Sequence, residues 1–174
     1  RVFTSSFSNK SDTTKRFSAD FMKTSPSWRT AMSFILKKKK VGVRVVMPLY
    51  SKIADQFRDS MKFITSISVP VAWRRQYCGI FEAKAGGVIY YLLHNQYYFK
   101  RDSLYGFYDD AERFAFFARA ILEIIPHIDF KPDIIHCNDW QTALTPLYYS
   151  TMYANQPGYE NIKTVLTIHN IQYQ

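Results

Sequence analysis

The sequence predicts an α/β fold, with a mainly parallel, Rossmann-like sheet and helices on its faces. Two short apolar runs lead directly into polar residues: Ile134-Ile135 into His136 to Asp139, and Val165 to Ile168 into His169-Asn170. Between them, the stretch from Trp140 to about Tyr153 has apolar residues at helical spacing. A strand, a helix and a strand of these lengths form a βαβ unit, whose strands are parallel and joined by a right-handed crossover.

The polar residues that follow these two strands should face one crevice, because parallel strands end at the same edge of a sheet. Ligands of open parallel sheets bind at this carboxyl edge. We therefore expect Asp139 and His169 to be neighbours. His169 could donate a hydrogen bond to a ligand oxygen or phosphate, or be a structural histidine with satisfied partners. Asp139 could bind sugar hydroxyls or stabilise positive charge, and it could also cap the helix that starts at Trp140.

The remaining elements follow from periodicity and turn residues. Strands are predicted at 41–48, 63–71, 73–81 and 88–93, an aromatic loop at 96–106, and a helix from near Asp109 to Pro126. Gly86-Gly87 marks a turn between two of the strands. Asp109, with Glu112 three residues later, fits a capping pattern, and Asp109-Asp110 also places negative charge at a helix N-terminus.

Composition indicates one globular domain. Of the 174 residues, 47% are hydrophobic and 17% aromatic, and no apolar run approaches the ~20 residues of a membrane span. Cys78 and Cys137 lie in different segments, so reduced thiols in a cytoplasmic protein are the simplest interpretation and a disulfide is the alternative. His136 and Cys137 lack further ligands at a suitable spacing, so no metal site is expected.

The net charge of +9 is confined to the first quarter of the chain. Residues 1–44 hold 11 Lys and Arg against 2 Asp and Glu, whereas residues 45–174 hold 12 of each. A basic patch on a domain would indicate nucleic acid or an anionic membrane. Because this charge lies outside the predicted domain, we expect neither partner, and a nucleic-acid binder with a basic arm stays a minor alternative.

Four segments carry a resemblance to a known family: 43–53, 105–115, 132–142 and 164–174. They come in the order and spacing found in ADP-glucose-type glycogen and starch synthases of the bacterial style, so residues 41–174 resemble the catalytic region of that family. The resemblance implies the N-terminal half of a GT-B glycosyltransferase, an enzyme with two Rossmann-like domains facing a cleft. Such enzymes are retaining, and they transfer glucose from ADP-glucose to the non-reducing end of an α-1,4-glucan without a metal or cofactor.

The resemblance also implies roles for particular residues. His169 would lie against the transferring glucose and Asp139 would line the same pocket, as catalytic residues. Asn170 and Gln141 would support them. Tyr108 and Asp109, in the motif that follows the aromatic loop, would contact substrate, although Phe107 stands where the family commonly has tyrosine. Trp140 is expected to be a wall or core residue.

The resemblance fails in the first 40 residues. Lys23 matches a family lysine that approaches the nucleotide phosphates, but Ser25 to Trp28 replace the glycines that should follow it, and Pro26 lacks an amide N–H. The apolar first strand expected before Phe21 is also missing. We therefore treat residues 1–40 as an atypical basic segment, either disordered or read from a shifted frame. Sequencing the encoding DNA tests the second option, which is excluded if no alternative frame encodes the missing strand and glycine loop.

Residues 41–174 are then expected to be an N-terminal domain that stops before the second domain. On this interpretation the chain alone would not synthesise glucan. The alternative is an inactive fragment that binds glucan.

Overall fold

The computed structural model describes residues 1–5, 41–51, 58–85, 87–169 and 171. The strands are β1 (Val2–Ser5), β2 (Val43–Pro48), β3 (Lys62–Val71), β4 (Arg74–Ala85), β5 (Val88–His94), β6 (Ile134–Asn138) and β7 (Lys163–Thr167). The helices are α4 (Gln96–Phe99), α5 (Asp110–Glu123), η2 (Ile125–His127), η3 (Trp140–Thr142), α6 (Leu144–Tyr148) and η4 (Tyr149–Tyr153). No helix in this part of the chain is long and apolar enough to cross a membrane.

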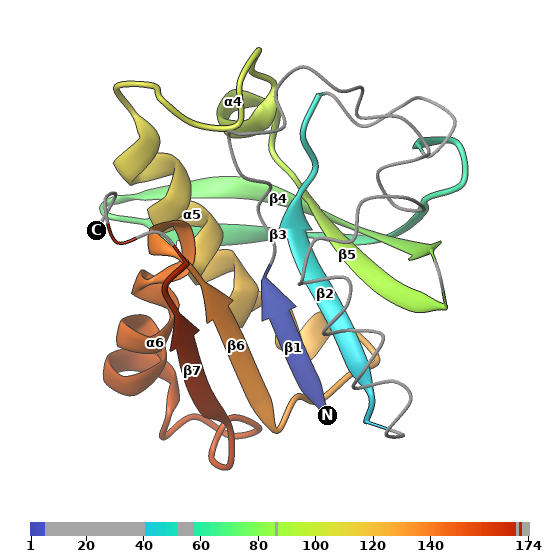
Figure 1. Ribbon diagram of the computed structural model, residues 1–174, viewed down its shortest axis with the longest axis vertical. Coiled ribbons are helices and arrows are strands. Elements are labelled where there is room, and N and C mark those ends of the chain that lie inside the picture. The colour runs from blue at the N-terminus through green and yellow to red at the C-terminus, as the bar shows by residue number, and fades with distance from the viewer. Residues whose placement is uncertain (6–40, 52–57, 86, 170, 172–174) are drawn as a thin grey trace.

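The described strands form one sheet in the order β3-β4-β5-β2-β1-β6-β7. Within the run β5-β2-β1-β6-β7 each strand is parallel to the next, and β1, β6 and β7 run side by side in one direction (Figure 1). The α/β prediction is confirmed, as are the four strands predicted between residues 41 and 93. The sheet is extended on one side by antiparallel pairing of β3 with β4 and of β4 with β5.

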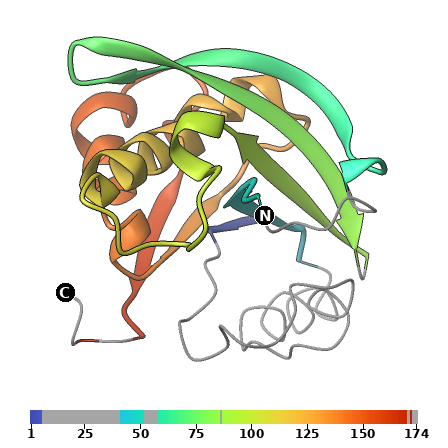
Figure 2. The same ribbon diagram turned by 90° about the horizontal axis from the view of Figure 1, so that it is seen from above.

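Turns with positive φ make this antiparallel extension possible. Gly87 (φ 72°) lies in the predicted turn before β5. Ala72 (φ 50°) lies in the turn between β3 and β4, which has no glycine, proline or other residue typical of turns. Gly86, the other residue of the predicted turn, is outside the described residues. The long hairpin of β3 and β4 curves around α5 (Figure 2). One face of this helix is thereby covered.

Strand β1 corrects the prediction that the domain begins at residue 41. Val2 to Ser5 pair in parallel with β2 on one side and β6 on the other, so they occupy an interior position of the sheet. Phe3 is fully buried. A four-residue strand has too little pattern to be recognised alone, and the neighbouring ladders supply its hydrogen bonds. Lys23 and residues 25–28, which were compared with the family's glycine loop, lie outside the described residues.

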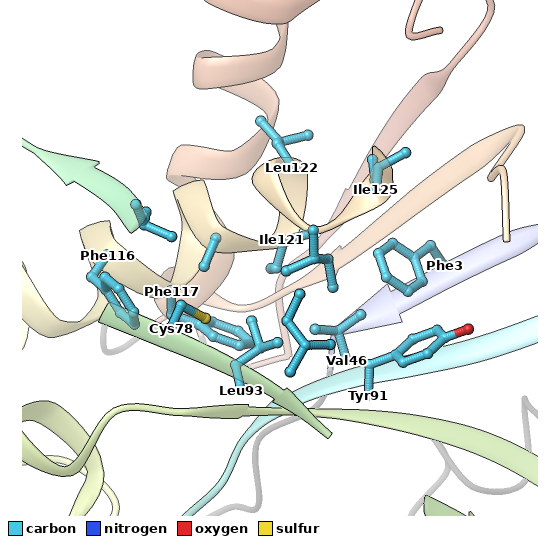
Figure 3. Packing of buried hydrophobic residues seen from close by; sticks show 14 of the residues in the cluster. Phe3, Val46, Cys78, Tyr91, Leu93, Phe116, Phe117, Ile121, Leu122 and Ile125 are labelled. Carbon is cyan, nitrogen blue, oxygen red and sulfur yellow. The ribbon is translucent and has the colours of Figure 1, made fainter. Parts of the chain in front are cut away.

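The core fills the space between α5 and the sheet. Phe117 and Ile121 of the helix pack towards Leu93 and Val46 of the strands, with Phe3 at one end of the cluster (Figure 3). The predicted helix is confirmed, and most of its buried residues are apolar. Arg113 is the exception, because charged side chains are rarely buried and the structure buries this one completely.

Two further predictions needed correction. Part of the predicted aromatic loop is the short helix α4, capped by Asn95 Oδ1, which accepts a 3.0 Å hydrogen bond from the Tyr98 amide; Tyr98 is fully buried. The helix predicted after Trp140 is present as three successive helical segments, but its spacing did not identify the core face. Leu144 and Leu147 are exposed, whereas Thr145 is buried and donates to the Ala118 carbonyl oxygen at 3.0 Å.

Candidate functional site

The candidate site lies where the order of the parallel strands reverses. From β1 the chain proceeds to β2 on one side, whereas β6 and β7 are added on the other. Open α/β sheets bind ligands at such a switch point, outside the carboxyl ends of the strands. Thr4 and Ser5 of β1, Asn138 at the end of β6, Asp139 directly after it, and His169 after β7 meet there.

Asp139 and His169 are in direct contact, which confirms that they are neighbours. The backbone N–H of His169 donates to Asp139 Oδ1 at 2.6 Å, and the Asp139 amide donates to the Thr167 carbonyl at 2.8 Å. The carboxylate makes no cap bond to the helical turn that follows it, so the capping alternative is wrong. Asp139 is buried, with 6% of its surface exposed, whereas His169 is exposed.

The backbone of Asp139 is unusual. Its φ of 60° and ψ of −178° lie in a region that glycine alone adopts without cost. A strain of this kind persists only where surrounding contacts impose it. Here the bonds to Thr167 and His169 do so, and they aim the carboxylate at the end of β7.

Asn138 is a site residue that the sequence analysis missed. It is fully buried, its Nδ2 donates to the Ser5 carbonyl at 2.6 Å, and its Oδ1 lies 3.2 Å from His169 Nε2. One amide therefore connects the end of β1 to the imidazole. The available signal was its position as the last residue of a strand, immediately before Asp139, but its partner on β1 was not recognised as a strand.

Gln141 lies in the helical turn that follows Asp139. Its side chain is buried, and Oε1 has no hydrogen-bond partner among the described residues. A buried amide oxygen without a hydrogen-bond partner costs free energy, so Gln141 Oε1 is suited to accept a hydrogen bond from a ligand. Trp140 packs edge-on against Phe114 of α5 at 4.9 Å and against Tyr105 at 6.2 Å between ring centroids, so it packs against the core, which agrees with the prediction of a wall or core residue.

Tyr108 and Asp109 lie at the start of α5. Tyr108 is 95% exposed, and Asp109 Oδ2 pairs with Arg101 at 2.7 Å instead of capping the helix. The predicted capping pattern is therefore wrong; Asp110 Oδ2 instead accepts the amides of Gly106 and Phe107 at 2.5 and 3.1 Å. A contact of Tyr108 or Asp109 with substrate stays a prediction.

Two other predicted substrate-binding residues, Lys23 and Asn170, lie outside the described residues. His136 is turned towards β7, where its Nε2 lies 2.8 Å from Thr167 Oγ1. Both cysteines are free and buried, and burial raises the pKa of the Cys137 thiol to about 12. Within the described ranges, no three His, Cys, Asp or Glu side chains gather in a way that could hold a metal ion.

These features define an α/β domain in which an acid, an amide and an imidazole lie together at the switch point of the sheet. The family model described as the starch synthase catalytic domain matches residues 29–174, so the chain belongs to this family. The match begins inside the segment that the sequence analysis set apart as atypical, and residues 29–40 therefore belong with the family region.

Individual proteins agree with this assignment. The chain is 53% identical to a glycogen synthase of Desulforamulus reducens and 54% identical to one of Bacillus cytotoxicus, each over 139 residues. These matches cover 80% of this chain but 29% of each relative, so the chain spans less than a third of their length. The catalytic domain of starch synthase IV from Arabidopsis thaliana, solved with ADP and acarbose, superposes with a TM-score of 0.80 at 25% identity, over 99% of this chain and 34% of that one.

Proposed function

We propose that this chain forms the acceptor side and one wall of a glucosyl-transfer site. The reaction would move glucose from ADP-glucose to the non-reducing end of an α-1,4-glucan, with retention of configuration. The observation that carries the proposal is the Asp139–His169 contact at the switch point of a chain that belongs to the starch synthase family. The ADP and acarbose in the description of the Arabidopsis structure support a nucleotide and a glucan-like ligand as partners.

The residues at the crevice have chemistry suited to this reaction. His169 is exposed and held by its backbone, so its ring can lie against the transferring glucose. The Asp139 carboxylate places negative charge beside the site, which would favour the positive charge of an oxocarbenium-like transition state. Gln141 Oε1 supplies an acceptor for a sugar hydroxyl. Asn170, Lys23, Tyr108 and Asp109 remain proposed substrate contacts from the resemblance alone.

The proposed reaction needs no metal or cofactor, because the sugar is activated by the ADP leaving group. We place the protein in the cytoplasm, in keeping with its two free thiols. By the family resemblance, the second half of the cleft would come from a second Rossmann-like domain outside these 174 residues. The 174-residue chain alone should therefore bind glucan without extending it.

The experiment combines a transfer assay with a binding assay on the whole chain. Radiolabelled ADP-glucose and glycogen are incubated with the protein, and retention of the protein on immobilised glycogen is measured in parallel. Retention that is lost in His169→Ala and Gln141→Ala, without label transfer, supports the proposal. A chain that does not bind glycogen contradicts the acceptor role, and turnover by the chain alone contradicts the need for a second domain. Arg75→Met, on the distant β3–β4 hairpin, is the control for retention.

A further inference from the structure

The orientation of the Asn138 amide is fixed by strand β1. Nδ2 lies 2.6 Å from the carbonyl oxygen of Ser5 and 3.2 Å from Thr4 Oγ1. A backbone carbonyl oxygen can only accept a hydrogen bond, so the Asn138 atom facing it must be the NH₂ group. Reversing the amide would set two oxygens against each other in a fully buried place. The oxygen Oδ1 must therefore face the other way.

Asn138 Oδ1 faces the imidazole of His169, 3.2 Å from Nε2. An amide oxygen also can only accept, so Nε2 must carry a hydrogen to make this bond. We propose that Asn138 is a positioning residue that holds His169 in the Nε2–H tautomer, which leaves the lone pair of the neutral ring on Nδ1. The Ser5 carbonyl thus sets the orientation of the Asn138 amide, and this amide sets the tautomer of the His169 ring.

The contact of His169 with Asn138 differs from that of His136 with Thr167, the other histidine contact at this edge of the sheet. His136 Nε2 lies 2.8 Å from Thr167 Oγ1, and a hydroxyl can donate or accept, so that contact is compatible with either tautomer. His169 has a partner without this freedom. Its backbone N–H is at the same time held by Asp139, the residue after Asn138, so two consecutive residues fix the ring and the backbone of His169.

This assignment changes what His169 offers to a ligand. The sequence suggested a hydrogen-bond donor for a ligand oxygen or phosphate. With Nε2–H directed to Asn138, the neutral ring has its lone pair on Nδ1, so that nitrogen can accept a hydrogen bond but cannot donate one. The second nitrogen becomes a donor only when the ring takes up a proton. The tautomer is a property of the chain itself and does not depend on glucosyl transfer.

Nitrogen NMR of the imidazole rings tests the assignment in the whole 174-residue chain. The protein is labelled with ¹⁵N-histidine and studied near pH 8.5, about two units above the ordinary pKa of histidine. Two-bond proton–nitrogen correlations distinguish the tautomers, and His169→Gln identifies the signals of His169. We expect the Nε2–H form to exceed the other by about tenfold, the upper range for one hydrogen bond. A predominant Nδ1–H form, or comparable amounts of both, overturns the proposal.

Two variants test whether Asn138 sets the tautomer. Asn138→Ala removes the acceptor and should reduce the tautomer ratio several-fold, whereas Thr4→Val removes a partner of Nδ2 but keeps Oδ1 beside the ring and should leave the ratio unchanged. An unchanged ratio in Asn138→Ala overturns the proposal. Circular dichroism verifies that each variant folds. If Asn138→Ala does not fold, Asn138→Ser replaces it, because serine also removes the amide oxygen but keeps a polar side chain.

Discussion

The backbone nitrogen of His169 lies 2.6 Å from Asp139 Oδ1, across 30 residues of sequence. This bond connects the ends of β6 and β7, so it closes the crossover at the edge where the candidate site lies. Asp139 makes it from a backbone conformation that favours glycine. The site is therefore assembled at the cost of local strain.

Two replacements of Asp139 should separate the energetic effect of its backbone strain from that of its side-chain hydrogen bond. Asp139→Ala loses the acceptor and keeps the unfavourable φ of 60°, whereas Asp139→Gly loses the acceptor but relieves the strain. Strain of this kind costs about 1–3 kcal/mol, part of which is offset by glycine's greater entropy in the unfolded chain. We expect the glycine variant to be more stable than the alanine variant by about 1–2 kcal/mol in urea denaturation. Equal stabilities would show that the strain has no energetic weight.

Removal of the Arg113 side chain should destabilise the fold strongly. Its guanidinium is fully buried, donates through Nε to the Tyr98 carbonyl at 2.7 Å, and pairs with Asp110. Arg113→Met takes the guanidinium away from the Tyr98 carbonyl and from Asp110, in surroundings that water does not reach. We therefore expect a loss of about 3–5 kcal/mol in the free energy of unfolding. Arg75→Met is the control, because Arg75 is exposed and should cost under about 1 kcal/mol. Similar losses for both variants would contradict this account of Arg113.

Stability should fall in alkaline solution. Burial raises the pKa of the Cys78 and Cys137 thiols to about 12, whereas in the unfolded chain a thiol has a pKa near 8.5. Between these values the unfolded chain releases protons that the folded chain retains, so unfolding becomes easier as pH rises. Each thiol then lowers the free energy of unfolding by up to about 1.4 kcal/mol per pH unit.

Urea denaturation at about pH 7.5 and about pH 9.5 measures this loss, below the range where exposed tyrosines ionise. Cys78→Ala removes one of the two thiols and should reduce the difference between the two pH values, although it lowers stability at both. A difference that is unchanged in this variant would show that Cys78 does not contribute to the pH dependence.

Substitution of Gln141 should distinguish a ligand-binding role from a structural one. Its Oε1 is buried and has no hydrogen-bond partner among the described residues, so Gln141→Met removes a desolvated group at nearly constant volume. We expect a stability change within about 1 kcal/mol. Glycogen retention should nevertheless fall. A loss of several kcal/mol in thermal or urea unfolding would instead indicate that the side chain supports the fold.

Local sequence patterns were sufficient for much of the site. Strands β6 and β7 were recognised because each is a short apolar run that ends in polar residues, and the helical spacing between them implied parallel strands. Asp139 and His169 could therefore be placed together. Asn138 could not, because its role depends on the carbonyl of Ser5, and nothing local identifies Val2 to Ser5 as a strand.

The sequence by itself determined the α/β class, the extent of α5 and the edge of the sheet that carries the site, because strand and helix periods depend on neighbouring residues. Tertiary structure alone decided that Val2 to Ser5 occupy the middle of the sheet, that Arg113 is buried, and that Asn138 faces His169. The physical reason is that a short strand, a buried charge and an oriented amide are stable only through distant partners. Those partners are brought together when the chain folds.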